Sequence, residues 1–152
     1  MAEIALQLDI AAPRAVVLAA LSTHDGLTSW WTTAVDRDGD DVLLFDFPDV
    51  PEPFRLRRER ADQDRVVWTN VGTFPPHWAG TWISWDLAEQ PGAPGRTRLL
   101  FRHGGWQPGS EEGVPMVAGT WAELLVRLKD YAQSGKAQPY FVKRPPHEEA
   151  SG

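Results

Sequence analysis

The sequence predicts one α+β domain in which helices cover one face of an antiparallel sheet. Three observations lead to this prediction. The chain has 152 residues, which suits a single hydrophobic core. Between residues 34 and 103, short segments of alternating apolar and polar residues follow one another, separated by turn-forming residues. One long amphipathic helix pattern then spans residues 114–134.

The N-terminal part predicts a strand followed by two short helices. Glu3–Ile10 alternates, with its isoleucine and leucine residues on one side, as in a half-buried strand. Pro13 suits the first turn of a helix, and apolar residues recur at helical spacing as far as Leu21. Leu27–Thr32 predicts a second short helix, and Gly26 separates the two.

The middle of the chain is typical of an antiparallel meander. Each strand-like segment ends in turn residues, such as Asp38-Gly39-Asp40 or the run from Pro91 to Gly95. Connections as short as these join antiparallel neighbours. The expected strands are Ala34–Arg37, Val42–Phe47, Phe54–Arg60, Val66–Val71, Thr81–Glu89 and Thr97–His103.

The last helix is expected from about Val114 to Ser134, with Gly135 ending it. Residues 143–152 are rich in proline and polar side chains, which predicts a disordered tail after a single domain of residues 1–142. The apolar stripe of the helix is Val114, Val117, Trp121, Leu124, Leu125, Leu128 and Tyr131.

Composition excludes several functions. The net charge of −6 opposes general binding to nucleic acid. With no cysteine there is no thiolate nucleophile or disulfide, and the four histidines are too dispersed for a metal site. No glycine-rich phosphate loop is present, so no cofactor is expected. No apolar run approaches the roughly 20 residues of a membrane span, and the start lacks a cationic signal, which predicts a cytoplasmic protein.

Eight tryptophans stand out in the composition. Strand alternation and helix phase direct seven large aromatic residues toward one interior. Two interpretations remain open, a packed aromatic core and an apolar pocket between the sheet and the last helix, because a long helix cannot touch a bent sheet everywhere. The seven are Trp31, Phe45, Phe47, Trp68, Trp85, Phe101 and Trp121.

Asn70 and His103 end two of the expected inward strand faces. They could orient the polar end of a ligand, and His103 could act as an acid or base, since histidine titrates near neutrality. The simpler interpretation is a polar rim. Trp78 and Trp106 lie in expected loops, and if exposed they suggest a pocket mouth or a surface for self-association as a homodimer.

Five segments together resemble the SRPBCC superfamily of START-like, Bet v 1-like proteins, and within it the family of activator of Hsp90 ATPase homologue 1-like proteins. The resemblance covers about Ile4 to Val142. The segments that carry it are Ala12-Pro13-Arg14-Ala15-Val16, Leu27-Thr28-Ser29-Trp30-Trp31, Asp64-Arg65-Val66-Val67-Trp68-Thr69, Thr97-Arg98-Leu99 with His103-Gly104-Gly105-Trp106, and Gly119-Thr120-Trp121 with Leu124 and Leu128.

The resemblance implies a helix-grip fold, a curved antiparallel sheet wrapped around a long C-terminal helix with two short helices after the first strand. It implies a cavity for an apolar or amphipathic small molecule. An alternative is an enzyme of the aromatase/cyclase type with His103 as acid or base. Docking on an Hsp90-like chaperone is implied by the resemblance alone, and it is not expected for a chain without an additional chaperone-binding module.

Overall fold

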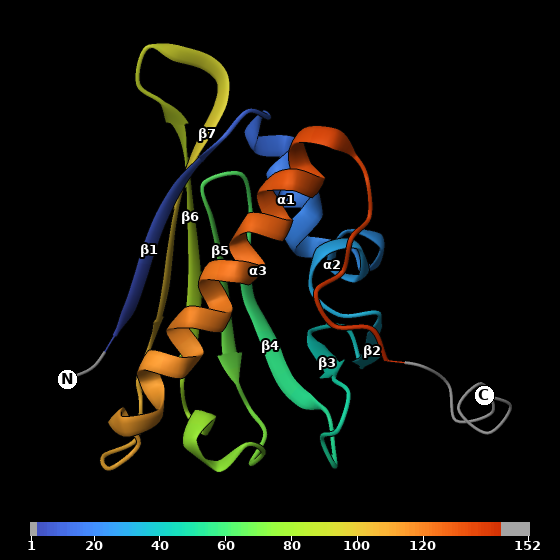
Figure 1. The fold of residues 1–152 in the computed structure, drawn as a ribbon, viewed down its shortest axis with the longest axis vertical. Coiled ribbons are helices and arrows are strands. Elements are labelled where there is room, and N and C mark those ends of the chain that lie inside the picture. Colours follow the sequence, from blue (N-terminus) through green and yellow to red (C-terminus); the bar gives the residue numbers. More distant parts are fainter. Residues whose placement is uncertain (1–2, 144–152) are drawn as a thin grey trace, which may run out of the picture.

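A computed structural model describes residues 3–143 of the chain. Its seven strands form one antiparallel sheet in the order β1-β7-β6-β5-β4-β3-β2. The sheet curves around the long C-terminal helix α3, and two short helices, α1 and α2, close one side (Figure 1). This is the helix-grip arrangement that the resemblance implied, so the fold prediction is confirmed.

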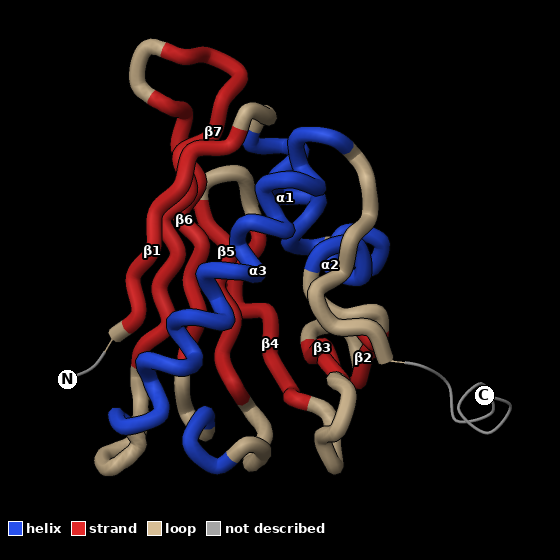
Figure 2. Tube along the Cα trace, in the orientation of Figure 1, coloured by secondary structure: helices blue, strands red, loops and turns tan. Residues whose placement is uncertain are grey.

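The strands lie within a few residues of their expected positions. Figure 2 shows β1, β7, β6, β5 and β4 side by side, with β3 and β2 below α2. The largest difference is at β7, which begins at Ala93 and not at Thr97, because Gln90 already pairs with Ala93 across a tight turn at Gly92, whose φ is 72°. The strands are β1 Ile4–Ile10, β2 Ala34–Asp38, β3 Val42–Asp46, β4 Phe54–Ala61, β5 Arg65–Asn70, β6 Trp82–Gln90 and β7 Ala93–Gly104.

The helix pair follows β1 as expected, but its second member begins earlier. Helix α1 spans Arg14–Ser22, and α2 spans His24–Trp30, whereas the sequence predicted a start at Leu27. Thr23 caps α2 by accepting a hydrogen bond from the N–H of Gly26 at 3.0 Å. Gly26 is therefore inside the helix, where the lack of a side chain lets α2 lie against the backbone of α1.

Helix α3 spans Val114–Ser134, and Gly135 ends it with a φ of 75°, as the sequence predicted. Six residues of the expected stripe are buried, and Tyr131 is half-buried. Two single-turn 3-10 helices, η1 (Pro76–Trp78) and η2 (Glu111–Gly113), precede β6 and α3. Within the described residues, no helix is both long and apolar enough to span a membrane.

After α3 the chain returns along α2 toward β2 and β3, as the tan segment in Figure 2 shows. Its backbone binds that of the α2 end, with Tyr140 N–H donating to Trp30 O at 3.1 Å and Phe141 N–H to Trp31 O at 2.8 Å. Lys143 pairs with Asp46 at 2.7 Å. The rest of the expected tail, residues 144–152, lies outside the described residues.

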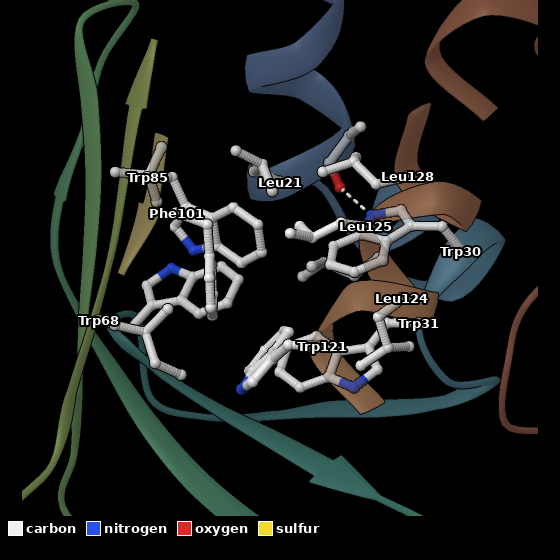
Figure 3. Packing of buried hydrophobic residues seen from close by; sticks show 14 of the residues in the cluster. Leu21, Trp30, Trp31, Trp68, Trp85, Phe101, Trp121, Leu124, Leu125 and Leu128 are labelled. Atoms are coloured by element: carbon white, nitrogen blue, oxygen red, sulfur yellow. Dashed lines mark hydrogen bonds between the residues drawn. The ribbon is translucent and has the colours of Figure 1, made fainter. Parts of the chain in front are cut away.

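The centre of the molecule, between the sheet and the middle of α3, is filled by aromatic side chains (Figure 3). Phe45, Trp68, Trp85 and Phe101 have no exposed surface. Trp85 contacts Phe101 with ring centroids 4.8 Å apart and Trp68 at 5.5 Å, both edge to face. At this place the packed-core interpretation describes the structure.

Candidate functional site

An apolar pocket of about 340 Å³ lies beside the N-terminal half of α3. Five elements surround it: the end of α2, the β3–β4 loop with the start of β4, the β5–β6 loop with η1, α3, and the returning C-terminal segment. The lining residues are Trp31, Phe47, Pro48, Val50, Phe54, Phe74, Pro75, His77, Trp78, Met116, Val117, Thr120, Trp121, Leu124 and Phe141.

Local sequence explains why the pocket opens here. Strands β3 and β5 end near the N-terminal half of α3, and the proline-rich β3–β4 and β5–β6 loops follow them. These loops do not present alternating side chains to the helix as a strand would. Phe54 connects the two loops by edge-to-face contacts with Phe47 at 4.8 Å and with Trp78 at 5.0 Å. Phe141 closes one side by packing on Phe47 at 4.9 Å.

Only part of the predicted aromatic set lines this pocket. Trp31, Phe47 and Trp121 do, whereas Phe45, Trp68, Trp85 and Phe101 belong to the packed centre behind them. Trp31 forms the boundary, because it stacks on Phe45 at 4.3 Å and on Trp68 at 5.8 Å. The two interpretations left open by the sequence thus apply to different ends of one aromatic cluster.

His103 is fully buried and does not line the pocket, but it orients residues that do. Its Nδ1 accepts a hydrogen bond from Trp121 Nε1–H at 3.1 Å. Nε2 therefore carries the proton of the neutral ring and donates to Thr81 Oγ1 at 3.1 Å, and that hydroxyl donates to Trp78 O at 2.7 Å. The imidazole also lies against the ring of Trp106, with centroids 4.3 Å apart.

This environment makes His103 a poor acid or base near neutrality. Burial, and to a smaller extent the nearby charge of His77, lower its pKa from 6.5 to about 3. Both ring nitrogens are occupied by hydrogen bonds within the chain. The lowered pKa and the occupied nitrogens disfavour proton exchange by His103 near neutrality, and its role as an acid or base stays a prediction.

Asn70 is also buried and lies outside the pocket wall. Its Oδ1 accepts from Gly72 N–H at 2.9 Å, while Nδ2 has no partner among the described residues. Neither Asn70 nor His103 lines the open space of the pocket. Their contact with a ligand stays a prediction.

Apart from Trp78, the sequence patterns do not single out the loop residues of the wall. Trp78 and Trp106, whose exposure the sequence left open, are buried. The β5–β6 loop folds Trp78 edge to face against Trp106 at 6.1 Å, and His77 stacks on Trp106 at 6.4 Å. The run of apolar residues from Phe74 to Trp78 inside a loop was the signal, since exposed loops seldom carry so many. Met116 is the most exposed lining residue, at 76%.

The site offers little for metals or charged groups. Among the described residues, no group of three histidine or carboxylate side chains is close enough to hold a metal ion. The residues that line the pocket include no lysine, arginine or carboxylate, and His77 and Thr120 are its polar side chains. The arrangement can therefore accommodate an apolar molecule, and it offers few groups for chemistry on it.

No protein-family model matches the chain, and no curated protein matches it in sequence. Solved structures do. The solution structure of the Aha1 dimer from Colwellia psychrerythraea is 27% identical with a TM-score of 0.76, covering 90% of this chain and all of that one. The protein SSP2350 from Staphylococcus saprophyticus is 13% identical with a TM-score of 0.70, covering 93% of this chain and 98% of that one.

A third similar structure is DynU16, a protein of the dynemicin biosynthetic locus. It is 21% identical with a TM-score of 0.69, and the match covers 93% of this chain but 51% of DynU16. At this identity the likeness concerns the fold.

Proposed function

The chain is a helix-grip protein of the SRPBCC superfamily, similar to Aha1 from Colwellia psychrerythraea, and we propose that it binds an apolar small molecule in the pocket beside α3. The observation that carries this proposal is the pocket itself, about 340 Å³ of space whose walls are almost wholly aromatic and aliphatic side chains. Small-molecule sites commonly have volumes of about 300–1,000 Å³ and apolar walls.

The wall is well suited to a flat ring. Indole and phenyl groups approach the space from different elements, with Trp31 and Trp121 tilted by 53° to each other at 5.2 Å. Edge and face contacts with an aromatic guest are each favourable. Met116 at the mouth is flexible and can adapt to the guest's shape.

The test begins with mass spectrometry of small molecules released from the denatured purified protein. It is followed by a thermal-shift screen with apolar ring compounds, of which fluorene is the first probe. A compound present at 100 times its dissociation constant adds about 2.7 kcal/mol to the free energy of unfolding.

Two variants locate the binding. Thr120→Trp places an indole in the pocket and should abolish the shift, because Thr120 lines the space. Ala122→Trp adds the same indole on the exposed face of α3 and should leave the shift unchanged. Equal shifts in both variants, or no stabilising compound at all, would contradict the proposal.

Homodimer formation and docking on a chaperone can each be tested separately. A homodimer is suggested by the Aha1 dimer, and light scattering on the purified protein measures its mass directly. Docking on an Hsp90-like chaperone has only the family resemblance behind it, and a pull-down with purified chaperone decides it. The aromatase/cyclase alternative is less favoured, because His103, its candidate acid or base, is buried and has a lowered pKa.

A further inference from the structure

The tryptophan N–H groups of the interior differ in whether they have an acceptor. An indole nitrogen can only donate, so each buried one needs a partner. Trp30 donates to Ala20 O at 2.8 Å, Trp106 to His103 O at 3.1 Å and Trp121 to His103 Nδ1 at 3.1 Å. These three are satisfied by the chain itself.

The buried polar side-chain atoms without a partner are all donors. Within residues 3–143 they are Nε1 of Trp68, Nε1 of Trp85 and Nδ2 of Asn70, and no buried oxygen shares this condition. Figure 3 shows the ring nitrogens of Trp68 and Trp85 near each other on the sheet side of the aromatic cluster. The interior therefore has an excess of hydrogen-bond donors.

Two further indole donors belong to the pocket wall. Trp31 and Trp78 both line the pocket, and their Nε1–H groups have no acceptor among the described residues. The hydroxyl proton of Thr120 is already donated to Met116 O at 3.3 Å. Trp31 is the innermost of these donors, because its ring stacks directly on Trp68.

We infer that the ligand of this pocket carries an uncharged acceptor oxygen that accepts a hydrogen bond from Trp31 Nε1–H. This inference rests on the proposed function and narrows its ligand to apolar ring compounds with a carbonyl, such as ketones, quinones and lactones. An uncharged group is favoured because no lysine or arginine lines the space, and an unpaired charge in an apolar site is costly. A pure hydrocarbon fits the same walls but leaves the donor unsatisfied.

Fluorene and 9-fluorenone separate the two contributions, since they share a rigid tricyclic shape and differ by the ketone. Calorimetric titration should give an affinity for fluorenone about fivefold higher than for fluorene, in proportion to one hydrogen bond in a dry site. Trp31→Phe should remove this preference while both compounds still bind. Trp82→Phe, which removes a half-buried indole packed over Gly104 outside the pocket wall, should keep it.

A second measurement needs no variant. In protein labelled with ¹⁵N-tryptophan, the indole N–H signal of Trp31 should move downfield with fluorenone and not with fluorene, as a newly bonded donor does. Equal affinities together with equal spectra would overturn the inference and leave the apolar pocket standing. Binding of neither compound would instead remove the proposed function on which it rests.

Discussion

Acidification should destabilise the folded protein through His103 well above the pH at which carboxylates protonate. In the native state the ring is buried, accepts a hydrogen bond from Trp121 at Nδ1 and has a pKa of about 3. In the unfolded chain the same ring has a pKa near 6.5. Because the native pKa is lowered, the unfolded state binds the proton first, and the free energy of unfolding falls as the pH drops below about 6.5.

The size of the effect follows from these two values. At a pH well below both pKa values, the difference between them corresponds to a loss of about 5 kcal/mol in the free energy of unfolding, at 1.36 kcal/mol for each pKa unit. Near pH 5 the unfolded ring is almost fully protonated and the native ring is still neutral, so the loss is about 2 kcal/mol. For a domain of this size, 2 kcal/mol lowers the melting temperature by about 4–8 °C.

Urea unfolding of the wild type and of His103→Gln between about pH 7.5 and pH 4.5 isolates this contribution. Glutamine cannot titrate and keeps one acceptor and one donor, so its free energy of unfolding should fall less steeply with acid. The carboxylates and other histidines contribute equally to both proteins, and His24→Gln, at an exposed ring, controls for losing any histidine. Parallel pH profiles for the wild type and His103→Gln would refute the assignment of His103 as a buried neutral ring.

Three other predictions concern the helices. Gly26→Ala should lower the free energy of unfolding by several kcal/mol, because a Cβ there would lie 2.5 Å from a carbonyl oxygen of α1. Gly119→Ala in α3, whose Cβ meets no atom within 4 Å, should raise it by about 0.5–1 kcal/mol. Denaturant titration measures both variants, and equal effects would contradict the close approach at Gly26. Thr23→Ala should cost about 1 kcal/mol through loss of the N-cap of α2, and Thr23→Ser should restore it, so an unchanged melting temperature in the alanine variant would argue against the cap. Leu128→Ala should cost about 2–5 kcal/mol, since Leu128 has no exposed surface, and a cost below 1 kcal/mol in urea unfolding would indicate a looser core.

The fold was predictable because its elements carry independent local signals. Alternation placed the strands, and the apolar stripe together with Gly135 gave the limits of α3. The error at α2 has a definite cause. Gly26 predicts a break between helices, because glycine often ends a helix. In the structure it instead lies inside α2, where it allows close packing on α1, and Thr23 caps the helix.

The sequence predicts which face of the sheet a side chain is on, but not whether that side chain belongs to the packed centre or to the pocket wall. Phe45 and Phe47 alternate onto the same side of the sheet, yet Phe45 belongs to the packed centre and Phe47 to the pocket wall. Periodicity cannot distinguish them, because the difference depends on tertiary neighbours. Phe45 packs on Trp31 and Trp68, whereas Phe47 packs on Phe54 and Phe141 beside the open space. Phe74, Trp78 and Phe141 lie outside the regular strands and long helices, so no periodic pattern could assign them.

The large aromatic side chains that fill the centre also determine the position of the pocket. Trp68, Trp85 and Phe101 occupy the space that a helix crossing a curved sheet would otherwise leave beneath its middle. The pocket lies where the strands end and loops face the N-terminal half of α3. A guest in this pocket would therefore lie between the packed indoles and the open mouth. Trp31 would contact the guest, while its ring also stacks on Trp68 in the packed centre. Because Trp31 belongs to both the core and the wall, changes at this residue should affect ligand preference and stability together.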